Sequence, residues 1–370
     1  MQDHYEQIES LLRQSHDMPD SSARTALIKE CVHIADLTQD QICQFHVRAI
    51  FIHCAFESGA ADEMLVALGW CIGVYDKDPE LFDTVFEEPN LIIGIMSRAF
   101  GYLTDFPSIS RERIESMLDD YERRHREAGL GLRSIYLERT RCGFWMGDRE
   151  IAKENFQKFQ SSPRKDGWDS ESERIFKTDF YIHMGDDAAA VAEAAPVIHS
   201  DAPANDVTHW VMCFVLESLV RLNRLEDAQS CHQRSYRLCR DNPKYLGLVS
   251  MHANYLTAIG EHAKAIGTIE EQAPWLLETC SFDKKMAFYV VGWKLCRDLA
   301  DAGKSSVRLK LPETIGPDCE NDRYPCRDLA DWFQREAKQI AALFDERNGN
   351  DAISQSVQNM LDLYPGNAPS

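Results

Sequence analysis

A turn-forming residue followed five positions later by a small residue recurs along this chain at a nearly constant interval. Four copies share the spacing: Gly147 with Ala152, Gly185 with Ala190, Asn223 with Ala228, and Gly260 with Ala265. A third position, four residues further on, can face the same way; it holds Phe156, Ala194, His232 and Ile269. The turns are separated by 38, 38 and 37 residues, a period typical of stacked helical hairpins.

Extending the period outward places the turns at Asp20, Gly59, Thr104, Gly147, Gly185, Asn223, Gly260 and Gly303. About eight antiparallel helical hairpins then cover most of the chain. Amphipathic helical stretches dominate and strand-like alternation is scarce, with Ser306–Glu313 the best strand candidate. We therefore expect an all-α fold, a right-handed α-solenoid or superhelix.

Three regions follow from the pattern. Residues 1–303 are predicted to form the repeat array. Residues 304–324 are predicted to form an irregular linker, because Pro312, Gly316, Pro317 and the following Pro325 interrupt the helical pattern in a polar context. Residues 325–364 are predicted to form a C-terminal helical cap, in which a long amphipathic helix ends at Asn348, Gly349 and Asn350.

Composition limits the classes of function. Hydrophobic residues make up 44% of the chain, enough to bury a large core, and the net charge is -20. Because phosphate binding needs clustered Lys and Arg, this charge argues against general nucleic-acid binding. The start of the chain lacks the basic and apolar regions of a signal peptide, and no apolar run is long enough to span a membrane.

Twelve cysteines occur without a Cys-x-x-Cys pair, mostly in apolar helical stretches where a free thiol acts as a small hydrophobe. Cys319 and Cys326 flank the irregular segment, but a disulfide there is not expected in a reducing compartment. We therefore expect a reduced, cytoplasmic protein.

The segment from Arg133 to Trp275 resembles tetratricopeptide repeats (TPR), through the layout of Gly147, Ala152, Phe156 and Pro163. The Trp, Leu-Gly and Tyr that the family carries in its first helix do not all occur in any copy, and the period is longer than the family's. HEAT-like or other helical-hairpin repeats remain alternatives. The resemblance implies a concave groove that binds a peptide or another protein.

Catalytic motifs are weak. Gly303, Lys304 and Ser305 match the end of a phosphate-binding loop, but the position five residues before Gly303 is Asp298 instead of the required glycine. His46 and His53 could share a helix face with Cys54 nearby, yet no further ligands follow at zinc spacing. We expect no catalytic residues, no metal and no cofactor.

The position six residues before each proposed turn is always polar or charged. These positions hold Gln14, His53, Arg98, Arg141, Asp179, Glu217, Asn254 and Arg297. A solvated helix face would explain this as well as a polar stripe along an inner groove. Adding helical neighbours four residues away gives the predicted partner-binding groove: Leu137, Arg141, Trp145, Ile175, Asp179, His183, Cys213, Glu217, Arg221 and Asn254.

The expected function is a non-catalytic interaction scaffold or adaptor that binds a protein or peptide partner, and neither nucleic acid nor membrane. The alternatives are a ligand- or peptide-sensing regulator and a helical accessory domain of an enzyme complex.

Overall fold

The computed structural model of the chain describes residues 2–18, 21–57, 61–164, 170–200, 202–205, 207–279 and 281–362. The predicted turns at Asp20 and Gly59, and residues 363–364 of the predicted cap, lie outside these residues. The chain divides into two compact units. The first comprises residues 1–142, 155–163 and 278–281, and the second comprises residues 143–154, 164–277 and 282–370.

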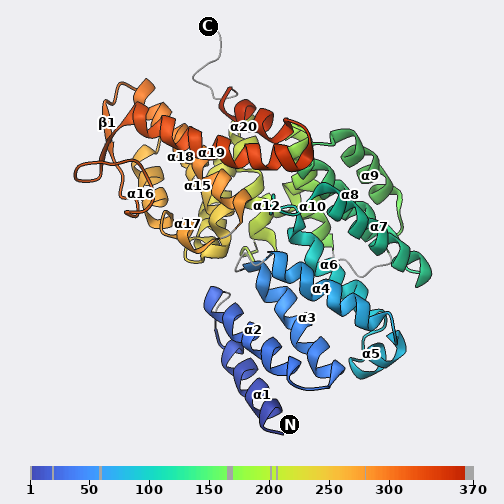
Figure 1. The fold of residues 1–370 in the computed structure, drawn as a ribbon. Helices are drawn as coiled ribbons and strands as arrows, with labels where there is room; N and C mark the ends of the chain where they lie inside the picture. The colour runs from blue at the N-terminus through green and yellow to red at the C-terminus, as the bar shows by residue number, and fades with distance from the viewer. Residues whose placement is uncertain are drawn as a thin grey trace. The chain divides into compact units, whose positions relative to one another are not determined.

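Helices account for most of the described chain (Figure 1). The first unit contains α1 (Gln2–His16), α2 (Ser22–Asp36), α3 (Gln41–Glu57), α4 (Ala61–Tyr75), α5 (Pro79–Val85), α6 (Leu91–Leu103) and α7 (Arg111–Glu127). The helices α8 (Arg133–Trp145) and α9 (Arg149–Ser161) each contribute residues to both units.

The second unit continues with further helices and one short hairpin. They are α10 (Ser170–His183), α11 (Asp187–Ile198), α12 (Thr208–Phe214), α13 (Leu216–Arg221), α14 (Leu225–Cys239), η1 (Pro243–Tyr245), α15 (Leu246–Ala258), α16 (His262–Gln272), α17 (Trp275–Glu278), α18 (Phe282–Asp301), β1 (Ser306–Arg308), β2 (Arg323–Pro325), α19 (Cys326–Asn348) and α20 (Ala352–Asp362).

The all-α prediction is confirmed, and helices pack mainly with their neighbours along the chain. In the first unit α1 packs on α2, α2 on α3 and α3 on α4; in the second, α10 packs on α11 and α15 on α16. None of the described helices has the length and apolar character needed to cross a membrane.

The predicted turns at Thr104, Gly147, Gly185, Asn223 and Gly260 separate consecutive helices, and the turn at Gly303 separates α18 from β1. Five of these turn residues have a left-handed backbone with positive φ: Gly147 at 77°, Gly185 at 73°, Asn223 at 56°, Gly260 at 77° and Gly303 at 82°. Glycine and asparagine tolerate this conformation best, which explains their recurrence at the ends of first helices. The side chain of Asp186 then caps α11 by accepting a hydrogen bond from the Ala189 amide.

The small residues after the turns are core residues. Ala152, Ala190, Ala228 and Ala265 are all 0% exposed. A Cβ on Gly143 of α8 would lie 3.0 Å from the amide nitrogen of Ala152 and 3.1 Å from its Cβ. The two helices of that hairpin therefore approach closely because neither residue carries a larger side chain.

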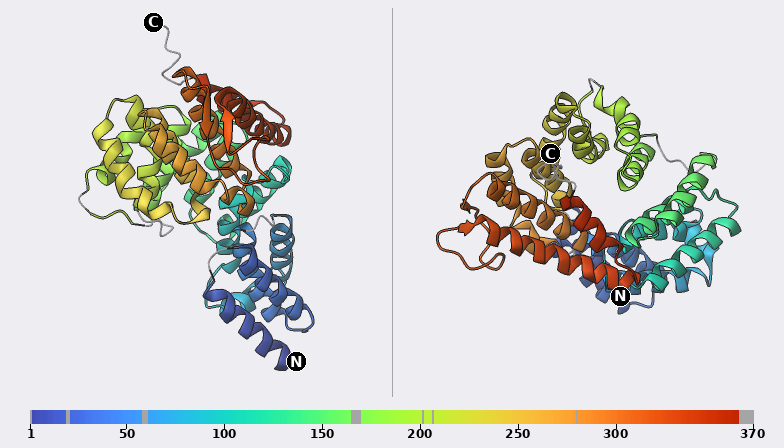
Figure 2. Two further views of the ribbon diagram at one scale, coloured as in Figure 1. Left: turned by 90° about the vertical axis from the view of Figure 1, so that its left-hand side faces the viewer. Right: turned by 90° about the horizontal axis from the view of Figure 1, so that it is seen from above.

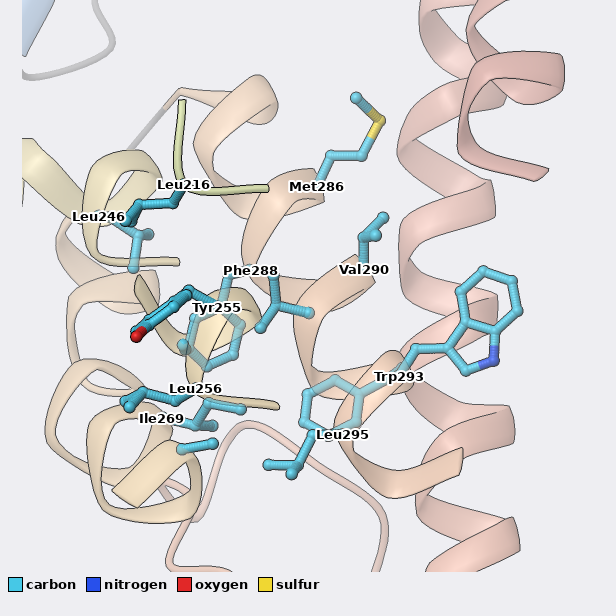
Figure 3. Close-up of a cluster of buried hydrophobic side chains, with 14 of the residues drawn as sticks. Leu216, Leu246, Tyr255, Leu256, Ile269, Met286, Phe288, Val290, Trp293 and Leu295 are labelled. Atoms are coloured by element: carbon cyan, nitrogen blue, oxygen red, sulfur yellow. The ribbon is translucent and has the colours of Figure 1, made fainter. Parts of the chain in front are cut away.

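A large apolar cluster fills the second unit between its later helices. Its members include Leu246, Leu256, Phe288 and Leu295, from α15 and α18 (Figure 3). Gly292 of α18 lets Phe333 of α19 approach, because a Cβ there would lie 2.6 Å from the Phe333 ring. Each of these side chains stabilises the unit by about 1.5–3 kcal/mol when it is fully buried.

The segment predicted to be an irregular linker contains the antiparallel pair β1–β2. Ser306 pairs with Pro325 and Arg308 with Arg323, so only the start of the strand predicted over Ser306–Glu313 is a strand. Val307, Leu309 and Tyr324 are buried in the apolar cluster. The segment is thus packed onto the unit through alternate apolar side chains.

The C-terminal helices α19 and α20 contact the turn at Gly147, which belongs to the same unit (Figure 2). The side-chain amides of Asn348 and Asn350 donate hydrogen bonds to the carbonyls of Trp145 and Met146, each over 2.8 Å. As predicted, α19 ends at Asn348, with Gly349 as its left-handed cap. The predicted C-terminal helices therefore bind the end of α8 as well as packing on α18.

Candidate functional site

Five charged or amide side chains from consecutive hairpins of the second unit form one connected network. We call it the polar ladder, and its members are Asp187, Glu217, Arg221, Asn254 and Lys294. Arg221 joins the carboxylates of Asp187 and Glu217, at N···O distances of 2.6 Å and 2.8 Å. Asn254 donates to Glu217 over 3.2 Å and accepts from the Lys294 ammonium over 3.3 Å.

The hairpin repeat positions these groups. Asp187 opens α11, Glu217 and Arg221 lie one turn apart on α13, and Asn254 and Lys294 lie on α15 and α18. Glu217 and Asn254 are 37 residues apart in sequence, and Asn254 and Lys294 are 40 apart, close to the interval between the turns. The ladder therefore crosses the hairpins instead of following one helix.

The buried charged side chains of the ladder are paired with groups of opposite charge. The Lys294 side chain is only 4% exposed, and its ammonium lies 3.6 Å from the Glu217 carboxylate, which is 43% exposed. Burial raises the pKa of the Asp187 carboxyl, but hydrogen bonds from Arg221 and Ser218 outweigh burial and hold that pKa below its ordinary value. The hydrogen bond to Asp187 in turn raises the pKa of Arg221. Both groups are ionised at neutral pH.

An aromatic patch, defined as Phe144, Trp145, Asp179 and His183, lies at the ends of α8 and α10. The Phe144 and His183 rings stack, with centroids 4.6 Å apart and an interplanar angle of 18°. Asp179 lies 3.5 Å from the His183 imidazole, and Trp145 meets both His183 and Phe344 of α19. His183 ends α10 and Asp187 begins α11, so the Gly185 turn links the patch to the ladder along the chain.

The structure brings six of the ten predicted groove residues together in these two groups. Trp145, Asp179 and His183 belong to the aromatic patch, and Glu217, Arg221 and Asn254 belong to the ladder. Arg141 belongs to the first unit, where it donates to the Gly101 carbonyl over 3.1 Å and faces Glu138 at 3.5 Å.

Three predicted groove residues are buried. Leu137 and Cys213 are each 1% exposed, so neither side chain is available to a partner. Asn254 is 7% exposed, and its amide bonds to Glu217 and Lys294. Ile175, like Trp145, is half-buried against the apolar cluster. A spacing of four places residues on one helix face, but a broad apolar face also includes positions that pack inward.

The other positions of the predicted stripe vary in exposure. Gln14, His53 and Arg98 are exposed, and Arg297 is half-buried. In the last hairpin Lys294, three residues before Arg297, joins the ladder. Lys294 lies nine residues before the Gly303 turn, three more than the spacing of the predicted stripe.

Sequence reasoning missed Asp187, Phe144 and Lys294. A signal for Lys294 was present, because it is a lone charge in the apolar run Phe288–Cys296 and follows Asn254 by about one period. Lone charges in apolar helices are buried only with partners. The Gly303 triplet forms a helix end, with the Lys304 amide donating to the Leu299 carbonyl over 3.0 Å.

Comparison with known proteins identifies no relative: no protein-family profile matches the sequence, and no curated protein matches it.

Proposed function

We propose that this protein is a non-catalytic scaffold or adaptor of the TPR-like, α-solenoid type. In this proposal its partner is a protein segment that binds over the polar ladder and the adjoining aromatic patch. The observation that carries the proposal is that Glu217 and Arg221, both partly exposed, are held by fixed partners on three neighbouring hairpins.

Fixed partners favour recognition for an energetic reason. A long charged side chain that must be immobilised on binding costs about 0.5–1.5 kcal/mol. Arg221 is already held by two carboxylates, and Glu217 by Arg221, Asn254 and Lys294. These groups can therefore offer hydrogen bonds at little further entropic cost.

The aromatic patch supplies the complementary apolar contact. Binding energy in protein interfaces concentrates in aromatic and arginine side chains, and surrounding charges fix the register of the partner. Phe144, Trp145 and His183 stand beside Asp179, and Arg221 follows on the next hairpin. This combination suits an extended peptide better than a nucleic acid, since the chain carries a net charge of -20.

Quantitative affinity purification of the full chain from its own cells tests the proposal. The double variant Glu217→Gln/Arg221→Gln keeps a polar side chain at both positions and removes their charges. We expect one protein partner to be recovered about tenfold less, which corresponds to about 1.4 kcal/mol of binding free energy.

The matched control is Glu226→Gln, which changes an exposed carboxylate on the adjacent helix α14 and should leave recovery unchanged. Equal recovery of every partner by the wild type and the double variant would contradict the proposal. A small molecule that co-purifies and is lost in the double variant would instead favour the sensing regulator.

A further inference from the structure

Three helices of the second unit bring two thiols and an imidazole to one point. Cys213 comes from α12, Cys239 from α14 and His252 from α15. Their sulfur and nitrogen atoms all lie within 4.8 Å of one another, and Cys213 Sγ is 3.3 Å from His252 Nε2. All three residues are buried. The cluster is separate from the polar ladder and from the aromatic patch.

The upper limit of 4.8 Å is about 1 Å wider than the spacing of ligand atoms around a tetrahedral zinc ion. Zn–S bonds of about 2.3 Å and Zn–N bonds of about 2.0 Å give ligand-to-ligand distances of about 3.5–3.8 Å. Ser235 Oγ lies 3.4 Å from His252 Nε2 and donates a hydrogen bond to the Cys231 carbonyl over 2.6 Å. Because its proton is used in that bond, the hydroxyl oxygen keeps lone pairs that it can offer to a metal ion.

A second histidine orients the first. His232 Nδ1 lies 3.0 Å from His252 Nδ1, so one of these nitrogens is protonated and donates a hydrogen bond to the other. When His252 is the donor, its Nε2 presents a lone pair toward Cys213. Metal-binding histidines commonly donate their other N–H to a fixed acceptor in this way. His232 is itself held by stacking on Tyr236, with centroids 5.3 Å apart.

The charge of the two thiolates determines which charge a bound cation should carry. Half-buried aromatic side chains, including Trp210, Phe214 and Tyr245, pack around Cys213 and Cys239. Two thiolates and one neutral imidazole around a divalent cation give a site with no net charge. A site of that kind avoids the several kcal/mol that a buried net charge costs. A monovalent cation would leave one negative charge in the same surroundings.

We propose that Cys213, Cys239 and His252 bind one divalent, thiophilic cation of the zinc type. The ion replaces the two thiol protons, which pass to solvent, and accepts the lone pair of His252 Nε2. It joins α12 and α14 of one hairpin to α15 of the next, so its role is structural. The ordinary role of such thiols is to pack as small hydrophobes, and the experiment must separate the two roles.

Cobalt provides the direct test, because thiolate ligands give Co²⁺ an intense sulfur-to-metal charge-transfer band. The full chain, reduced and stripped of metal with a chelator, is titrated with Co²⁺ and then with Zn²⁺. We expect the band to saturate at one Co²⁺ per chain and to disappear when Zn²⁺ displaces it. A folded wild-type chain that shows no band, or takes up no stoichiometric metal, would overturn the proposal.

Variants assign the ligands. Cys213→Ser/Cys239→Ser should abolish the band, whereas Cys231→Ala, a matched change of a buried thiol on α14, should retain it. His232→Ala should weaken metal affinity about 10- to 100-fold without changing the stoichiometry, as expected of a positioning residue. Circular dichroism of each metal-free variant checks its folding. If the double variant is unfolded, the single variant Cys213→Ala is titrated with Co²⁺ in its place. An unchanged charge-transfer band in Cys213→Ser/Cys239→Ser or in Cys213→Ala would refute the assignment of the ligands.

Discussion

Asn254 donates a hydrogen bond to Glu217 over 3.2 Å, and 37 positions separate the two residues. The same interval separates the turns at Asn223 and Gly260. The contact therefore joins equivalent positions of successive hairpins. Two residues that are one period apart in the sequence are therefore hydrogen-bonded in the structure.

This connection makes a prediction about stability. Glu217→Ala removes one partner of the buried Lys294 ammonium, and we expect the free energy of unfolding to fall by about 1–2 kcal/mol, since solvent screens the half-exposed carboxylate. Chemical denaturation measures the change. Adding Lys294→Met should recover much of the loss by removing the buried charge. The control is Glu226→Ala, at an exposed carboxylate. If Glu217→Ala were as stable as this control, Glu217 would not stabilise the buried Lys294.

The ladder also predicts a pH dependence. The folded pKa of Asp187 lies below its ordinary value of 3.8, because Arg221 and Ser218 hold the ionised form against the effect of burial. Its contribution to stability is therefore complete above the ordinary pKa and is lost as the pH falls through the folded pKa. Below about pH 4, the wild type should lose more unfolding free energy than Asp187→Asn, measured by denaturation at successive pH values. Parallel pH profiles would contradict this role.

Local rules make the turns and the buried alanines predictable from sequence. Gly185 and Gly260 adopt positive φ, and Ala190 and Ala265 are 0% exposed. These constraints act within a few residues of each turn, so spacing alone reveals them.

The missed features are long-range. The Asn350 amide meets the Met146 carbonyl across 204 positions, and Cys213, Cys239 and His252 come from three helices without the short spacing of a zinc motif. Spacing within one helix also placed Cys213 on the binding surface, because it does not indicate how wide the apolar face is. Tertiary packing determines each of these positions.

Close packing within hairpins predicts opposite effects for two glycine substitutions. Gly143→Ala places a Cβ 3.0 Å from the Ala152 backbone, whereas the Cβ of Gly267→Ala in α16 meets no atom within 4 Å in the part of the chain that the structure describes. We expect Gly143→Ala to destabilise the protein by about 1–3 kcal/mol and Gly267→Ala to stabilise it by about 0.5–1 kcal/mol. Urea denaturation of the two variants checks this difference. A stabilising Gly143→Ala would show that the two helices are not in close contact.

Enlarging a buried alanine tests the same packing in the next hairpins. Ala190→Leu and Ala228→Leu introduce three carbons at positions that are 0% exposed. We expect each to cost about 1–3 kcal/mol, seen as a lower melting temperature. Two unchanged melting temperatures would mean that these sites have room for a larger side chain.

The docking of the C-terminal helices can be measured with two glycines that share a backbone conformation. Gly147 and Gly185 have φ of 77° and 73°, so an alanine at either site pays a similar conformational cost, about 1 kcal/mol. A Cβ at Gly147 would also lie 2.5 Å from the Cβ of Ala352 and 2.9 Å from the Asn350 amide, whereas a Cβ at Gly185 meets no atom of the described residues within 4 Å. Gly147→Ala should therefore destabilise the protein by about 1–3 kcal/mol more than Gly185→Ala. Hydrogen exchange should locate the extra loss in α20, whose amides should exchange faster in Gly147→Ala only. Equal exchange in α20 of both variants would show that the Gly147 turn does not hold the C-terminal helices in place.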